Sequence, residues 1–328
     1  MLSLEQRVFI LGSGFSASMG LPTLLNLFHE IMERPERSGE SDKENVLNSL
    51  EILYPHFQKN ESPPSYPPFE EFLSLVFSAA DLPFFDSGYW DLKWRSALRL
   101  LTDCLAEKSK EAEGFQLLKN FVRNLRDGDI VITFNWDNLI ERALLSISRE
   151  VNFLSRDQSA VTILKLHGSL NWVEIPEGTS LKHPESVKFL SEKVVSTPDF
   201  LYYDVWDILD MPPLIVPPIF SKRVPVGGFF QNIWHEAHNS IIDAECVCVI
   251  GYSIPNDDLQ ARSLLRIAWA GRDIKRSSKS EAQDKYILID PNPAVCGKYA
   301  SLISGSFNFH QAYFSEQLFP LIFDSHLR

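Results

Sequence analysis

The residues best suited to chemistry in this sequence follow short apolar runs. Gly12-Ser13-Gly14-Phe15-Ser16 matches the G-x-G-x-x-G/A turn, with Ala17 in its last position. Glycines in such a turn let the backbone approach a pyrophosphate, and the helix that follows presents free N–H groups. A glycine turn with a purely structural role has the same composition, so this motif alone leaves both interpretations open.

Polar side chains that could act on a bound ligand follow two other apolar runs. Asn135 and Asp137 come after the run that ends at Phe134, and His167 comes after the run that ends at Leu166. Ligands of an open parallel sheet lie outside the carboxyl ends of its strands, so we expect these side chains to share a crevice with the glycine turn. A histidine there could act as a general base. Asn135 and Asp137 could instead cap the next helix, where both residue types are favoured.

Two further turns are candidates for contacts with a nucleotide. Gly251-Tyr252-Ser253-Ile254-Pro255 and Asp290-Pro291-Asn292-Pro293 each follow an apolar run. Turns of this composition offer backbone amides and side-chain acceptors at the same edge of a sheet. We therefore add Gly251, Ser253, Asp290 and Asn292 to the candidate binding residues.

The elements that must position these residues are five runs rich in Val, Ile, Leu and Phe. Their apolar residues are nearly continuous rather than alternating, which indicates strands buried on both faces of a parallel sheet. Helical patterns follow three of them, and this order predicts an α/β fold with a Rossmann-like, doubly wound parallel sheet. The predicted strands are Arg7–Leu11, Ile130–Phe134, Thr162–Leu166, Glu245–Ile250 and Tyr286–Ile289, and the predicted helices are Ala17–Met32, Trp136–Ser148 and Asp257–Ala270.

Two insertions interrupt this pattern within a single predicted domain, 1–328. A simple strand–helix–strand unit takes about 30 residues, and the stretch from Gly12 to Asp129 is several times longer. Its apolar residues recur at helical spacing, which predicts an inserted helical subdomain over 35–127. The second insertion, 171–228, is rich in Pro and aromatic residues and is expected to line one side of a cleft. The helices predicted in the first insertion are Asn45–Tyr54, Phe69–Ala80, Leu92–Lys108 and Glu113–Arg126.

Composition and charge exclude several classes of function. The chain has 328 residues, 43 acidic and 31 basic side chains and a formal net charge of −12. Such a balance argues against direct binding of nucleic acid, which requires basic surface to neutralise phosphates. No apolar run approaches the roughly 20 residues that span a bilayer, and the first residues lack a basic stretch and a small-residue cleavage site. We therefore expect a cytoplasmic protein that does not enter the membrane.

The cysteines and histidines do not predict a metal site. The chain has four cysteines and no Cys-x-x-Cys, whereas a structural four-cysteine zinc site needs closely spaced ligand pairs. Cys104, Cys246, Cys248 and Cys296 are expected to be small core residues. His235 and His238 have the spacing of a metal pair but no third ligand nearby, so we expect them on a helix surface. No zinc is expected.

In chain order, these motifs resemble those of the sirtuin family, NAD-consuming enzymes with a Rossmann-like large domain. The resemblance extends from about residue 8 to residue 293. It implies NAD as the substrate, with Asn135, Asp137 and His167 as catalytic residues. The candidate NAD-binding residues are Gly12, Ser13, Gly14, Phe15, Ser16, Gly251, Ser253, Asp290 and Asn292. The motifs are Gly12-Ser13-Gly14-Phe15-Ser16 with Gly20-Leu21-Pro22-Thr23, Thr133-Phe134-Asn135-Trp136-Asp137, Leu166-His167-Gly168-Ser169, Gly251-Tyr252-Ser253 and Asp290-Pro291-Asn292.

Two departures from the family pattern point away from protein deacylation. Deacylating sirtuins have a zinc ribbon built on paired Cys-x-x-Cys motifs, and they continue the glycine loop with Asp-Phe-Arg after the Pro. This chain has no Cys-x-x-Cys and continues with Thr23-Leu24-Leu25. In both respects it is similar to the sirtuin-like domains of bacterial antiphage defence systems, which hydrolyse NAD to ADP-ribose and nicotinamide.

The resemblance therefore implies an NAD glycohydrolase that depletes NAD in antiphage defence by abortive infection. Because unrestrained NAD loss kills the host, such an enzyme must be held inactive. We expect control by homo-oligomer formation or by a partner such as a HerA-type ATPase or another defence sensor. Two alternatives remain open from the sequence: a non-catalytic module that binds NAD or ADP-ribose and signals, and, third, an NAD-dependent protein deacylase.

Overall fold

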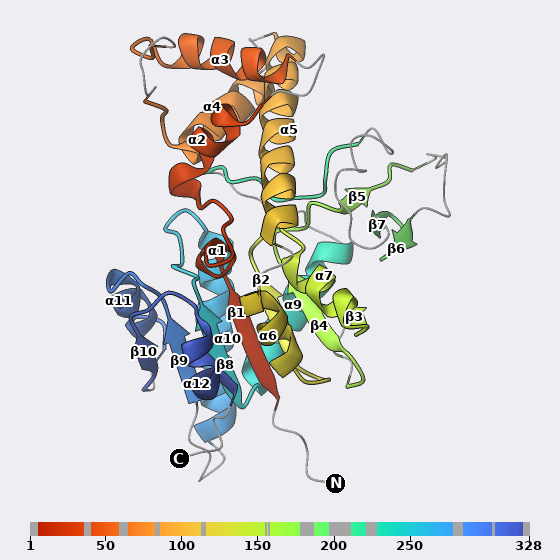
Figure 1. Ribbon diagram of the computed structural model, residues 1–328, viewed down its shortest axis with the longest axis vertical. Coiled ribbons are helices and arrows are strands. Elements are labelled where there is room, and N and C mark those ends of the chain that lie inside the picture. The colour runs from red at the N-terminus through yellow and green to blue at the C-terminus, as the bar shows by residue number, and fades with distance from the viewer. Residues whose placement is uncertain are drawn as a thin grey trace.

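The computed structural model describes a three-layer α/β body with a group of helices above one edge of its sheet (Figure 1). The predicted Rossmann-like fold class with inserted helices is confirmed. The described residues are 6–35, 41–58, 65–82, 86–112, 116–154, 156, 158–177, 187–196, 211–220, 228–277, 285–303 and 306–323.

A parallel sheet of seven strands forms the centre, in the order β10-β9-β8-β1-β2-β4-β3. All five predicted strands are present, and their bounds differ from the predicted ones by at most one residue at either end. The two additional strands are the short edge strands β3 and β10, which carry too few apolar residues to stand out in the sequence. The bounds are β1 Arg7–Leu11, β2 Ile130–Thr133, β3 Val151–Asn152, β4 Val161–Lys165, β8 Cys246–Ile250, β9 Lys285–Ile289 and β10 Asn308–His310.

The order of the strands reverses at β1. From β1 the chain continues to β2 and β4 on one side, and it then returns to β8 on the other side of β1 before continuing to β9 and β10. Since all these strands are parallel, the loops that follow β1, β2, β4 and β8 lie at one edge of the sheet. Such a reversal point is where ligands bind in open α/β sheets.

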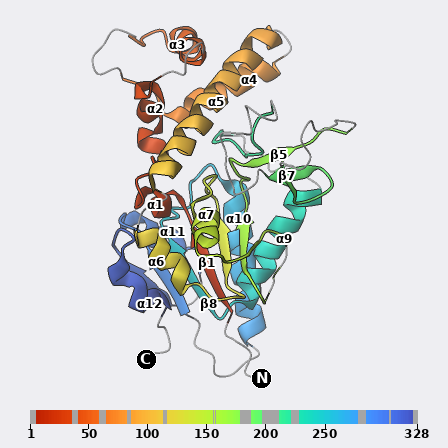
Figure 2. The same ribbon diagram turned by 45° about the vertical axis from the view of Figure 1, so that its right-hand side comes forward.

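Helices cover both faces of the sheet. Figure 2 shows α9 and α10 on one side and α6 and α12 on the other, and α6 packs against α7. No helix within the described ranges is both long and apolar enough to span a membrane. The bounds are α6 Gln116–Asn124, α7 Leu139–Ser146, α9 Gly228–Asp243, α10 Leu259–Ser277, α11 Ala294–Ala300, the 3-10 helix η3 Glu316–Leu318 and α12 Phe319–Phe323.

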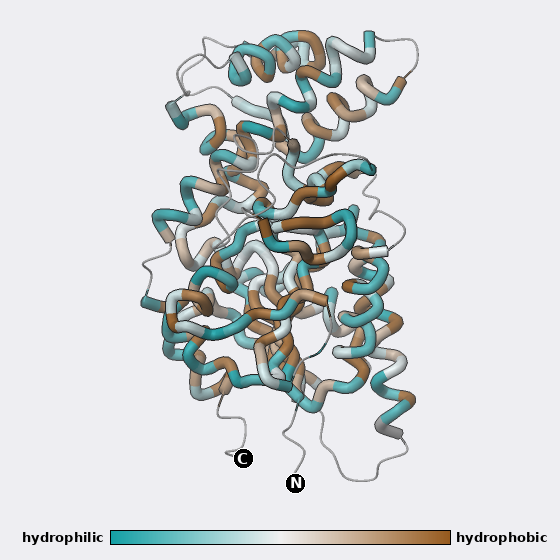
Figure 3. The backbone as a smooth tube through the Cα atoms, turned by 90° about the vertical axis from the view of Figure 1, so that its right-hand side faces the viewer, coloured by the Kyte–Doolittle hydropathy of each residue, from teal (hydrophilic) through white to brown (hydrophobic). Residues whose placement is uncertain are grey.

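The helices above the sheet, which are called the inserted helices below, have a hydrophobic core of their own. Phe28 lies at its centre, with ring centroids 5.1 Å from Phe69 and 5.0 Å from Phe72. Teal and brown segments alternate along these helices in Figure 3, as expected for one buried and one exposed face. The bounds are α2 Leu24–Glu33, α3 Asp42–Leu53, α4 Phe69–Asp81 and α5 Ser87–Ala112.

The predicted continuous helix Ala17–Met32 is wrong. The chain instead forms α1, Ser13–Ala17, and then α2, with a turn between them. Gly20 has a φ of +92° in this turn, a conformation that ends a right-handed helix and that glycine adopts at no steric cost. Similarly, the helix predicted from Trp136 begins only at Leu139, because the residues before it form the loop after β2.

The second insertion contains a small antiparallel sheet that the sequence did not predict. Its strand order is β5-β7-β6, with bounds Trp172–Glu174, Val194–Ser196 and Lys188–Phe189. Residues 178–186, 197–210 and 221–227 of this insertion lie outside the described residues. The segment 211–220 lies alongside the loop after β4, since the N–H of Val216 donates to the carbonyl oxygen of His167 at 2.8 Å.

Two glycines with positive φ, one at this contact and one away from it, give a test of how closely the 211–220 segment approaches the loop after β4. Gly168 has a φ of +80°, and a Cβ added there would lie 2.0 Å from the carbonyl oxygen of Leu214, whereas a Cβ at Gly20 would meet nothing within 4 Å. Gly20→Ala is expected to lower the free energy of unfolding by about 1–2 kcal/mol through backbone strain alone. Gly168→Ala should lower it by more than about 3 kcal/mol, because the 211–220 segment must also shift. Urea unfolding measures both, and equal losses would contradict the close approach.

Candidate active site

A pocket lies between the loops at the carboxyl ends of the strands and the helices α2 and α5. Leu24, Leu27 and Leu105 of α2 and α5 form an apolar wall, and Pro218 of the second insertion also lines the pocket. The structure brings six of the predicted site residues together here, from the loops after β1, β2, β4 and β8. They are Ser13, Ser16, Asn135, Asp137, His167 and Ser253.

The glycine turn after β1 packs directly on the turn after β8. The N–H of Gly12 donates to the carbonyl oxygen of Ile250 at 3.1 Å, and that of Gly14 donates to the carbonyl oxygen of Gly251 at 2.9 Å. A Cβ at Gly12 would lie 2.4 Å from the oxygen of Gly251. The glycines therefore let the two loops touch. The pocket itself is lined by the serines of the turn, Ser13 and Ser16.

A hydrogen-bonded network joins this turn to the loop after β2. The amide nitrogen of Asn135 donates to the carbonyl oxygen of Gly12 at 2.8 Å and to Oγ of Ser16 at 2.9 Å. The hydroxyl of Ser16 donates in turn to Oδ2 of Asp137 at 2.7 Å. Oδ1 of Asp137 also accepts the N–H of Leu139 at the start of α7, at 3.3 Å. Asp137 thus contributes both to the pocket and to the helix start, the two roles that the sequence left open.

A buried ion pair supports the loop after β2 from below. Nζ of Lys165 lies 2.8 Å from Oε1 of Glu141, and both side chains are almost fully buried. Lys165 also donates to the main-chain oxygen of Asp137. The pKa of Glu141 is raised, because burial disfavours the charged carboxylate by more than the nearby Lys165 favours it. This is the desolvation cost of a buried ion pair. Neither residue was predicted to belong to the site, although a lysine within an apolar strand was an available signal.

His167 is buried at the end of β4 and lies close to a carboxylate. Its Nε2 is 3.2 Å from Oδ2 of Asp258. The ring of Phe134 contacts the imidazole edge-on, with centroids 5.2 Å apart. Asp258 lines the same pocket and was not singled out from the sequence, because no motif spacing connects it with His167.

Six of the nine predicted binding residues do not line the pocket: the three glycines of the touching turns, and Phe15, Asp290 and Asn292. Phe15 is buried in the core of the sheet, with its ring centroid 4.9 Å from that of Phe314. Asp290 is buried, which raises its pKa, and its Oδ1 accepts the N–H of Asn292 at 2.8 Å. Asn292 accepts the N–H of Ala294 at the start of α11. In this structure, Asp290 and Asn292 stabilise the turn after β9.

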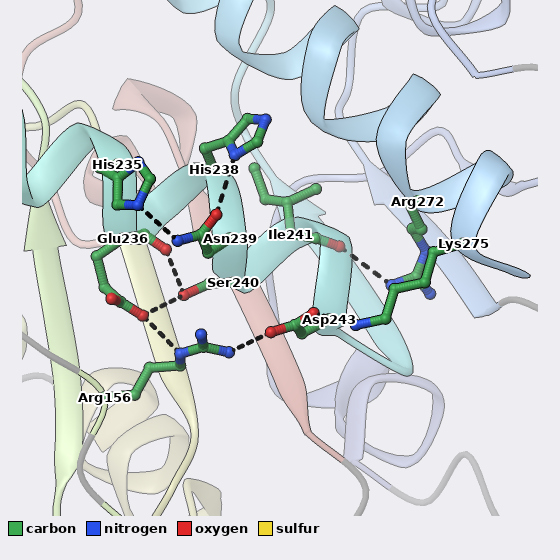
Figure 4. Close-up of polar contacts among 10 residues, drawn as sticks. All are labelled: Arg156, His235, Glu236, His238, Asn239, Ser240, Ile241, Asp243, Arg272 and Lys275. Atoms are coloured by element: carbon green, nitrogen blue, oxygen red, sulfur yellow. Dashed lines mark hydrogen bonds and ion pairs between the residues drawn. The ribbon is translucent and has the colours of Figure 1, made fainter.

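His235 and His238 lie on α9 (Figure 4), and neither of them lines the pocket. Nε2 of His235 contacts the amide of Asn239 at 3.0 Å, and Nδ1 of His238 contacts the same side chain at 3.2 Å. Figure 4 also shows Arg156 between Glu236 and Asp243. Among the residues that the structure describes, no cluster of His, Cys, Asp and Glu could hold a metal ion.

Comparison with known proteins gives similarities to solved structures alone. No family model and no protein of curated function matches the chain. A structure on the mechanism and regulation of Sir2 enzymes is 15% identical, with 99% of this chain and 94% of that chain covered and a TM-score of 0.47. A mutant Sir2 homologue with 2'-O-acetyl ADP ribose is 15% identical, with 98% of this chain and 91% of that chain covered and a TM-score of 0.47. A Sir2 homologue–NAD complex is 16% identical, with 97% of this chain and 88% of that chain covered and a TM-score of 0.43.

The buried ion pair yields a test of how the loop after β2 is supported. Lys165→Met is expected to lower the free energy of unfolding by about 3–5 kcal/mol, because it leaves the Glu141 carboxylate buried without its partner. The double variant Lys165→Met/Glu141→Leu should recover much of this loss, since it buries no charge. Guanidinium unfolding of the three proteins measures the difference. A double variant as unstable as the single one would contradict this explanation.

Proposed function

We propose that this protein is an NAD glycohydrolase, which cleaves NAD to ADP-ribose and nicotinamide. The observation that carries the proposal is the convergence of His167, Asn135, Asp137 and the serines of the glycine turn on one pocket. This pocket lies where the order of the parallel strands reverses, the usual place for a nucleotide in such sheets. The ordered motifs that resemble those of sirtuins support NAD as the ligand.

Cleavage of the bond between nicotinamide and ribose requires few catalytic groups, and side chains suited to these roles line the pocket. Nicotinamide is a cationic pyridinium in NAD and leaves as a neutral molecule, so cleavage of its glycosidic bond needs no general acid. The protein must stabilise an oxocarbenium-like ribose and position a nucleophile. In this proposal His167 acts as the base toward a water molecule or a ribose hydroxyl.

The remaining polar residues have supporting roles in the proposal. Asn135, whose amide nitrogen already binds Gly12 and Ser16, would direct its oxygen to the water or the ribose. Asp137 would supply negative charge near the developing cation. Ser13 would bind the pyrophosphate with its hydroxyl, because the N–H groups of the two glycines already donate to carbonyl oxygens of Ile250 and Gly251. Ser16 would hold Asn135 and Asp137 in place, since its hydroxyl already bonds to both.

We further propose that this activity serves antiphage defence as a regulated depletion of NAD. The support is the resemblance to the sirtuin-like domains of defence systems. Restraint would come from self-assembly or from a partner subunit such as a HerA-type ATPase. Deacylation is not favoured, because the paired cysteines of the zinc ribbon are missing from the sequence.

The proposal predicts nicotinamide release from NAD by the purified wild-type chain. His167→Ala and Asn135→Ala are each expected to reduce the rate about 10²–10⁴-fold, since they remove the base and a positioning amide. The measurement is nicotinamide release over time, repeated across protein concentrations. A rate per subunit that rises steeply with concentration would support control by assembly.

A second histidine provides the matched control. His238→Ala removes a half-buried imidazole from α9, outside the pocket, and should leave the rate unchanged. Tight binding of NAD without turnover at any concentration, unaffected by Asn135→Ala, would favour the binding module instead. Turnover of an acyl-lysine peptide faster than NAD hydrolysis would favour the deacylase.

A further inference from the structure

A carboxylate outside the motifs holds the imidazole of His167. Oδ2 of Asp258 lies 3.2 Å from Nε2 of His167, and the two side chains are only 3% and 7% exposed. Both residues line the candidate active site. An interaction between such buried groups is weakened little by water or salt. Asp258 is therefore placed to act on His167 directly.

Asp258 is itself fixed by the start of α10. Its other oxygen, Oδ1, accepts the N–H of Ala261 at 3.0 Å, and its own N–H donates to the carbonyl oxygen of Pro255 at 3.3 Å. A carboxylate at a helix start is stabilised by the N–H groups and by the helix dipole. One oxygen is thus used by the helix, and the other is directed at the imidazole.

The surroundings of the imidazole come from several elements. Phe134 contacts its edge, and Trp234 of α9 lies with its ring centroid 6.4 Å away. The other titratable groups that line this part of the pocket are Asp137 and Tyr252. Burial raises the pKa of Tyr252 well above its ordinary value, so its phenol stays neutral. The aromatic rings restrain the imidazole while Asp258 supplies a charge.

We propose that Asp258 is the positioning residue for His167, a role that rests on the proposed glycohydrolase function. A carboxylate only accepts hydrogen bonds, so Nε2 carries a proton and Nδ1 is left as the basic nitrogen. As water attacks the ribose carbon, the electron pair of the glycosidic bond leaves with nicotinamide, and the proton of the water goes to Nδ1. Asp258 stabilises the resulting imidazolium and remains ionised. The proton then passes to solvent.

The variant Asp258→Asn tests this role. It keeps a side-chain oxygen for the N–H of Ala261, because asparagine is also favoured at helix starts, and it removes the charge. Ring ¹⁵N shifts of labelled histidines in the full chain report the tautomer, and the signal of His167 is identified by its loss in His167→Gln. We expect the Nε2–H tautomer in the wild type and a mixture with Nδ1–H in Asp258→Asn. The kcat for NAD cleavage should fall about 10²–10⁴-fold, with KM little changed.

Two further variants separate this role from a general effect on structure. Asp257→Asn removes the neighbouring charge and should preserve both the tautomer and the rate, whereas Asp258→Glu restores a carboxylate and should recover part of both. An unchanged Nε2–H tautomer in Asp258→Asn would overturn the proposal. If the tautomer changes but the wild type cleaves no NAD, the action of Asp258 on His167 stands and only the glycohydrolase proposal fails.

Discussion

The contact between the turn after β1 and the turn after β8 is the constraint on which the site depends. Gly14 donates to the carbonyl oxygen of Gly251 at 2.9 Å, and Gly251 has a φ of +62°. Side chains at these positions would collide with the opposite backbone. The contact lies at the point where the strand order reverses. Ser16 is thereby brought within hydrogen-bonding distance of Asn135 and Asp137.

The inserted helices make the other half of the site. Leu24 and Leu27 of α2 and Leu105 of α5 face the polar loops across the pocket, and Trp136 anchors the loop after β2 by donating from Nε1 to the carbonyl oxygen of Val216 at 3.2 Å. An apolar wall excludes water and lowers the local dielectric constant, which strengthens interactions between charged groups. In the proposed reaction, such a wall would favour stabilisation of a ribose cation by fixed groups of the protein over stabilisation by solvent.

Much of the fold could be predicted from the sequence, because strands buried on both faces need nearly continuous apolar runs. The run Arg7–Leu11 predicted β1 with its bounds, and the polar residues after such runs include most of the polar side chains that line the pocket. Local turns were harder to predict: apolar residues that become buried, among them Met19 and Leu21, lie on both sides of the turn at Gly20. The apolar pattern therefore predicted one helix where the structure has two.

The partners of the site residues could not be predicted for a different reason. Lys165 meets Glu141, and His167 meets Asp258, only after strands and helices distant in the sequence have packed together. Similarly, Asp290 follows a strand as predicted, but its carboxylate accepts the N–H of Asn292 and does not line the pocket. Strand ends determine which loops share an edge, whereas side-chain direction depends on the packing of each loop.

The most direct test of this account is a crystal structure of the protein with ADP-ribose. We predict that the pyrophosphate lies against the hydroxyl of Ser13 and that the ribose which carried nicotinamide lies between Asn135 and His167. ADP-ribose bound elsewhere on the protein, with this pocket filled only by solvent, would contradict the account.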